Sequence, residues 1–110
     1  MRYEEVFEML SELEIPVAYN SFDVSSYDVE PPFCVFYYPS SDNFAADDKV
    51  YSKIENVSVE LYTNEKDFDL EQQIETIFDE HLIVYEKTEM YIEQERMFET
   101  LYTTQIIVNA

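Results

Sequence analysis

The chain contains no glycine in 110 residues. Phosphate-cradling loops, dinucleotide-binding fingerprints, EF-hand loops and nucleophile elbows all use glycine where the backbone must approach closely or adopt a positive φ. The sequence therefore excludes these four kinds of site in their usual forms. We also expect the turns to depend on Asn, Asp, Ser and Pro.

Acidic residues outnumber basic ones by 25 to 6, which gives a formal net charge of −19. The hydrophobic fraction of 46% and the aromatic fraction of 16% are too high for a disordered acidic chain, so we expect a folded domain. Six scattered bases cannot form the cationic patch that binds nucleic acid phosphates or an anionic membrane. The composition therefore predicts neither direct nucleic acid binding nor membrane binding.

The length and the cysteine content place the chain among small intracellular domains. A chain of this length is typical of a single domain, which we assign to residues 1–110. Cys34 has no second cysteine to pair with, which favours a reducing compartment. The longest apolar run, residues 33–38, is far shorter than the roughly 20 residues of a membrane helix. The first residues do not form a signal peptide, so we expect a cytoplasmic protein or one assembled there.

Apolar spacing predicts two helices. The first begins near Tyr3 and ends before Pro16, because the residue before proline avoids helical dihedral angles. Its apolar stripe consists of Tyr3, Val6, Phe7, Leu10 and Leu13. The second helix has Asp67 as its N-cap and fades near His81. Its buried stripe consists of Leu70, Ile74, Ile77 and Phe78.

Alternating and β-branched segments predict five strands. They cover residues 17–22, 33–38, 50–62, 83–92 and 98–108, with loops at 23–32 and 40–48 and a turn at 94–97. In the third strand Val57, Val59 and Leu61 point to one face, which we expect to contact Val6, Phe7, Leu10, Ile74 and Phe78. The resulting fold class is α+β, with a mainly antiparallel sheet and two helices packed on one face.

Catalytic groups are scarce. Cys34 is the only thiol and lies in an apolar run, where a free cysteine usually acts as a small hydrophobe. His81 is the only imidazole, and we interpret it as a helix-end residue. The fragment 47–49 resembles part of a metal-dependent nuclease site but lacks an upstream acid and a basic DNA-binding surface. We therefore predict a protein with no catalytic residues, no metal site and no cofactor.

Four stretches carry a resemblance to a known family. They are residues 41–51 (SDNFAADDKVY), 59–63 (VELYT), 70–75 (LEQQIE) and 85–92 (YEKTEMYI). The chain resembles the small tail-completion proteins, or head–tail joining proteins, of long-tailed phages and prophages of Gram-positive bacteria. The resemblance implies a tail-terminator-like fold and a homo-oligomeric ring at the head-proximal end of the virion tail. It also implies two partners, the tail-tube protein and the head–tail connector protein, with assembly in the host cytoplasm.

The ring that this resemblance implies requires contact surfaces. The candidate interface residues lie in and beside the loop at 40–48, and they are Asp42, Asn43, Phe44, Asp47, Asp48 and Tyr51. Ten tyrosines also favour a binding or assembly protein over an enzyme. One alternative is an acidic DNA mimic that inhibits a DNA-binding enzyme, displaying carboxylates such as Glu71, Glu75 and Asp79 along one helix. A metal-dependent enzyme is the third alternative.

Overall fold

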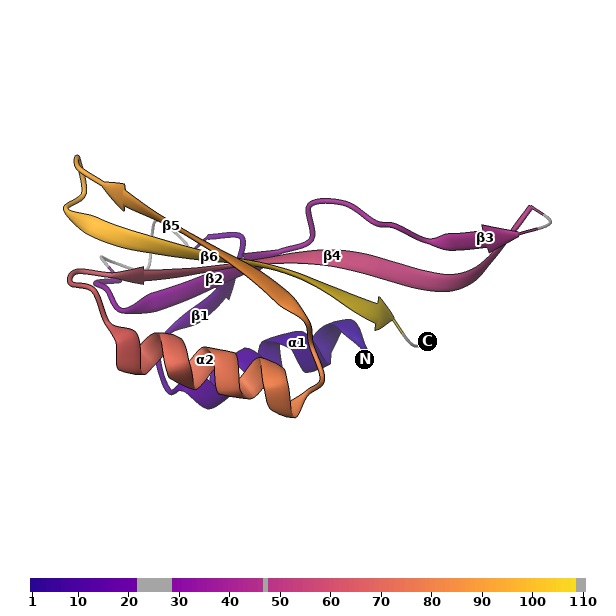
Figure 1. Cartoon of the computed structure of the whole chain (residues 1–110), viewed down its shortest axis with the longest axis horizontal. Helices are drawn as coiled ribbons and strands as arrows, with labels where there is room; N and C mark the ends of the chain where they lie inside the picture. Colours follow the sequence, from indigo (N-terminus) through magenta and orange to yellow (C-terminus); the bar gives the residue numbers. More distant parts are fainter. Residues whose placement is uncertain (22–28, 47, 109–110) are drawn as a thin grey trace.

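The computed structural model describes residues 1–21, 29–46 and 48–108, apart from the side chains of residues 50 and 51. Two α-helices and a short 3₁₀ helix pack on one face of a six-stranded sheet (Figure 1). In chain order the elements are α1 (Tyr3–Leu10), η1 (Ser11–Leu13), β1 (Val17–Tyr19), β2 (Phe33–Tyr37), β3 (Phe44–Ala46), β4 (Lys49–Thr63), α2 (Phe68–Glu80), β5 (Tyr85–Ile92) and β6 (Met97–Val108).

The sheet is mostly antiparallel, which confirms the predicted α+β class. Its strand order is β1-β2-β4-β6-β5, and β3 pairs with β4 outside this path. Only the β1–β2 pair is parallel among the strands that the structure describes. Strands β4 and β6 form the spine of the sheet, since they stay in register from Lys53 opposite Val108 to Thr63 opposite Phe98.

The core lies between the sheet and the helices, as the alternation in β4 predicts. Val57, Val59 and Leu61 are all buried there. The helices contribute the buried side chains Val6, Met9, Leu10, Leu13, Leu70, Ile74, Ile77 and Phe78. No helix in residues 1–21, 29–46 and 48–108 is both long and apolar enough to cross a membrane.

The first helical segment ends before Pro16 as predicted, but its last turn is the 3₁₀ helix η1, and Glu14 with a φ of 60° ends it. The predicted place of Phe7 is wrong. Phe7 does not join the core, since 46% of its surface is exposed. The stripe that faces the sheet runs through Val6, Met9 and Leu10, which turns Phe7 to the flank, where its ring lies 6.4 Å from that of Phe36.

The second helix begins as predicted. The Asp67 carboxylate accepts a hydrogen bond of 3.0 Å from the backbone N–H of Leu70, which is the capping contact expected of Asp at this position. A turn at residues 93–96, one residue earlier than the predicted 94–97, then joins β5 to β6.

The glycine-free turns contain five residues with positive φ in the described chain. Two of them, Asn20 and Asp48, are of the types that tolerate the left-handed region best. The other three are Glu14, Leu82 and Arg96, which are not. The expectation that Asn and Asp would supply these turns therefore holds for only part of them.

The segment at 40–48 is not simply a loop. Residues Phe44–Ala46 form β3, which pairs with the first residues of β4. The two strands form a hairpin that extends the sheet at this end. We call this hairpin, residues 40–56, the arm. It extends past the end of the helical layer (Figure 1), and the longest dimension of the molecule is 50 Å.

Candidate functional site

The six residues predicted to form an interface belong to the segment 40–56, and the structure gives different roles to those that it describes. Asp42 lies at its base, where one carboxylate oxygen accepts hydrogen bonds from Asn56 Nδ2 at 2.9 Å and Gln105 Nε2 at 3.1 Å. The Asn43 Oδ1 atom accepts a bond of 3.1 Å from the backbone N–H of Ile54. These two residues therefore fasten the first strand of the arm to β4 and β6.

The outer part of the arm presents the remaining residues. Phe44 is 60% exposed, although it is a large apolar side chain on a strand. Asp48 is exposed and lies at the turn with a φ of 61°. Asp47 lies outside the described residues, and for Tyr51 only its place in β4 is described. Among the predicted interface residues whose side chains are described, Phe44 is thus the one that presents a large apolar surface to a partner.

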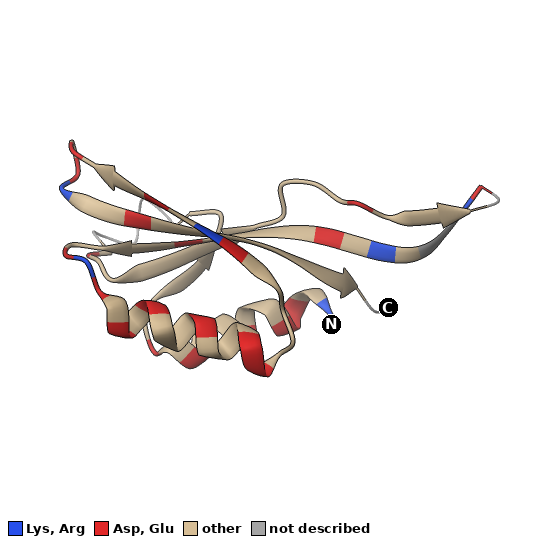
Figure 2. Cartoon of the chain, in the orientation of Figure 1, with Lys and Arg blue, Asp and Glu red and all other residues tan. Residues whose placement is uncertain are grey.

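Charge is distributed unevenly between the arm and the body. Residues 43–53, which we call the outer arm, contain two Asp and two Lys, so this segment has no net charge, and the rest of the chain carries the entire −19. The helical layer is the opposite extreme, since α1, η1 and α2 contain nine acidic residues and no Lys or Arg (Figure 2). Like-charge repulsion between two copies is therefore weakest where the outer arm makes the contact.

The face of α2 toward the sheet holds a network of ion pairs. Glu71 is 2% exposed, and its two carboxylate oxygens lie 2.6 Å from Lys66 Nζ and 2.7 Å from Lys87 Nζ. Lys87 also lies 2.8 Å from Glu75 Oε2, and Lys66 pairs with Glu89. A buried carboxylate held by two ammonium groups is a structural arrangement, because removal of either partner would leave an uncompensated charge.

This network bears on the DNA-mimic alternative. Of the predicted row of carboxylates, Glu71 is buried between two lysines and Glu75 is bound to Lys87. Asp79 is exposed. A mimic must display its carboxylates to the enzyme, so two of these three residues are not placed to imitate phosphates.

The thiol and the imidazole occupy separate environments. Cys34 is fully buried in the core, and burial followed by the nearby Glu60 charge raises the pKa of its thiol to about 12. A thiol with so high a pKa is a poor nucleophile. His81 ends α2, and its Nε2 atom lies 3.1 Å from a carboxylate oxygen of Glu12. In the part of the chain that the structure describes, no three His, Cys, Asp or Glu residues are grouped to hold a metal ion.

The structure contains an exposed aromatic cluster that the sequence does not predict. Tyr3, Phe7 and Tyr19 are 44–52% exposed and surround Phe36 and Tyr38, with Tyr3 and Tyr38 at a centroid distance of 5.2 Å. The cluster lies at the β1 edge of the sheet. The number of tyrosines in the sequence favours a binding surface, but only the folded structure shows that aromatic rings from α1, β1 and β2 lie together.

Comparison with known proteins establishes the fold alone. No protein-family model matches the chain, and no curated protein sequence matches it. One solved structure with this fold is a chain described as "Virion of native gene transfer agent (GTA) particle". The superposition has a TM-score of 0.68 and covers 96% of this chain and 92% of that chain, at 8% sequence identity. The likeness therefore extends over both chains almost completely.

Proposed function

We propose that this protein is a structural virion component that caps the tail tube and forms the head–tail joining interface as a homo-oligomeric ring. Its partners are further copies of itself, the tail-tube protein and the head–tail connector protein. It acts at the head-proximal end of the tail after assembly in the host cytoplasm, and it needs neither a cofactor nor a catalytic residue.

The observation that carries this proposal is the likeness to a chain of a virion. That likeness covers 96% of this chain, so it includes the helical layer, the sheet and the arm together. The sequence resemblance to tail-completion proteins gives the more specific role. Because a fold by itself does not determine function, the role at the end of the tail is to be tested in the particle.

The distribution of charge also supports assembly into a ring. A ring of identical subunits needs a heterologous contact, in which two different surfaces of the same chain meet. The outer arm, which has no net charge, and the acidic body are two such unlike surfaces. An acidic body facing a central channel would also repel DNA phosphates and let the genome pass without binding.

Deletion of the gene from a phage or prophage tests the proposal. Particles lacking the protein are expected to accumulate as DNA-filled heads and separate tails of abnormal length, as judged by electron microscopy. Expression of the wild-type gene from a plasmid should restore joined particles. Joined particles of normal tail length in the deletion strain would contradict the proposal. A gain of restriction or nuclease activity in that strain would support the DNA-mimic alternative instead.

A further inference from the structure

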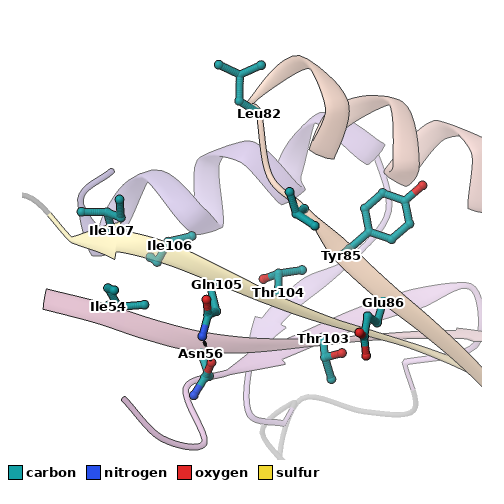
Figure 3. Close-up of a pocket in the computed structure, with 11 residues that line it drawn as sticks. Ile54, Asn56, Leu82, Tyr85, Glu86, Thr103, Thr104, Gln105, Ile106 and Ile107 are labelled. Carbon is teal, nitrogen blue, oxygen red and sulfur yellow. Dashed lines mark hydrogen bonds between the residues drawn. The ribbon is translucent and has the colours of Figure 1, made fainter. Parts of the chain in front are cut away.

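A groove opens beside β6, where β5 begins and the loop after α2 turns into it (Figure 3). Its volume is about 530 Å³, and its walls come from β4, β5, β6 and the α2–β5 loop. Glu86 is the one charged residue among the eleven that line it. Such a lining is unusual in a chain in which 28% of the residues are charged.

The loop at the mouth of the groove is energetically unfavourable in an isolated copy of the protein. Leu82 is 91% exposed and Val84 is 86% exposed, so both present apolar surface to water. Leu82 also has a φ of 59°, in the left-handed region that is sterically unfavourable for residues other than glycine. Two exposed apolar residues, one of them strained, are explained if a partner covers this loop.

The arm provides an occupant of matching chemistry. Strand β3 consists of Phe44, Ala45 and Ala46, all exposed and all uncharged. Strand β3 lies in the arm, which extends past the helical layer and away from the α2–β5 loop (Figure 1), and Phe44 on it is 60% exposed. Contact between an uncharged strand and a groove with one charged residue also avoids most of the repulsion between two chains of charge −19.

We infer that Phe44 of one copy inserts into the groove of the next copy, between Leu82 and Ile107, and that this contact links successive subunits. The inference rests on the proposed ring, and it specifies which two surfaces meet. The arm and the groove are different parts of the molecule, so the contact is heterologous and can close into a ring. An aromatic side chain buried at the centre of a contact contributes strongly to association.

Chemical cross-linking between two single variants tests the contact. Ala45→Cys lies on β3 and Val84→Cys lines the groove. The two purified variants are mixed and treated with bismaleimidoethane, a short thiol-reactive linker. Thr76→Cys, on the exposed side of α2, replaces Val84→Cys in the control mixture. The native Cys34 is fully buried, and the unmodified protein shows whether it contributes any product.

The inference predicts a covalent dimer in the Ala45→Cys and Val84→Cys mixture, at least tenfold more abundant than in the control mixture. Phe44→Ala, at an exposed position, should raise the dissociation constant between copies at least tenfold without unfolding the protein. Rings that form without the cross-link, or with undiminished affinity in Phe44→Ala, would overturn the arm contact and leave the proposed function standing. A protein that stays monomeric at every concentration would overturn both.

Discussion

The phenol oxygen of Tyr102 lies 2.7 Å from Oε2 of Glu75, so a fully buried ring of β6 donates a hydrogen bond to a carboxylate of α2. Glu75 also accepts bonds from Lys87 at 2.8 Å and from Tyr85 at 3.2 Å. The polar network on the sheet-facing side of α2 thus connects the helix to both β5 and β6. These three hydrogen bonds hold α2 against the sheet.

Tyr102→Phe should lower the free energy of unfolding by about 1.5–3 kcal/mol, the range for a hydrogen bond to a charged group. The substitution keeps the buried ring and removes only the donor to Glu75. Tyr85→Phe is the matched control, because its bond to the same carboxylate is longer and its side chain is only partly buried. Urea denaturation of both variants should show the larger loss for Tyr102→Phe, and equal losses would be inconsistent with the network described above.

Glu75→Gln and Glu99→Gln should change stability at neutral pH in opposite directions. Burial opposes ionisation of Glu75, but its bonds to Lys87 and Tyr102 outweigh burial and hold the pKa of the carboxyl below its usual range. Burial, followed by the Glu60 charge, raises the pKa of Glu99. Ionised Glu75 therefore stabilises the fold, whereas ionised Glu99 destabilises it.

The pH dependence of these two variants follows from the same shifts. The stability that Glu75 contributes is present above its unfolded pKa and is lost as the pH falls through its lower folded pKa. The penalty from Glu99 is largest above its raised folded pKa and disappears as the pH falls below its unfolded value. Thermal unfolding between pH 7 and pH 3 should show that the difference in stability between each variant and the wild-type protein shrinks toward zero as the pH falls. Differences of the same sign at pH 7 would refute this assignment.

Val59→Ala should destabilise the protein by about 2 kcal/mol, because it removes two buried methyl groups and leaves a cavity. Val59 is 1% exposed and lies at the centre of the spine strand β4. Val84→Ala removes the same atoms from a position that is 86% exposed, and it should change stability by less than about 0.5 kcal/mol. Chemical denaturation of both variants gives the comparison, and an unchanged midpoint for Val59→Ala would show that the strand register is wrong.

Leu82→Gly should stabilise the isolated protein by about 0.5–1 kcal/mol, because glycine adopts a positive φ without the steric penalty of leucine. The gain is partly offset by the greater flexibility of glycine in the unfolded chain. Leu82→Ala serves as the control, since it removes most of the side chain but retains the penalty. Both variants should assemble less well if the groove binds the arm. A destabilised Leu82→Gly protein would contradict the strain argument.

Strong periodic patterns in the sequence predicted most of the fold. The alternation of Val57, Val59 and Leu61 placed the buried face of β4, and the spacing of Leu70, Ile74 and Phe78 placed that of α2. The assignment of Phe7 to the core is wrong, because helical spacing shows the direction of the apolar stripe but not how many residues across it are buried. The left-handed residue that ends the helical segment after η1 is Glu14, a residue type that gives no signal for such a turn.

The candidate surface was harder to predict than the fold. Strand β3 was missed because Ser, Asp and Asn before it are typical of loops, whereas here Asn43 bonds to Ile54 and aligns the segment with β4. The groove combines residues from β4, β6 and the loop after α2, which are distant in sequence. Its clearest sign, an exposed Leu82 with positive φ, becomes visible only in three dimensions.

Sedimentation velocity of the purified protein, at several concentrations and at salt from 0.01 M to 0.5 M, tests the central claim of ring formation most directly. Net charge separates the copies at low salt, and the Debye length falls from about 30 Å at 0.01 M to about 8 Å at 0.15 M. The proposed ring predicts monomers at low salt and a single closed oligomer that strengthens as salt rises. Monomers under every condition would contradict the ring, and an assembly that weakens as salt rises would contradict the uncharged contact.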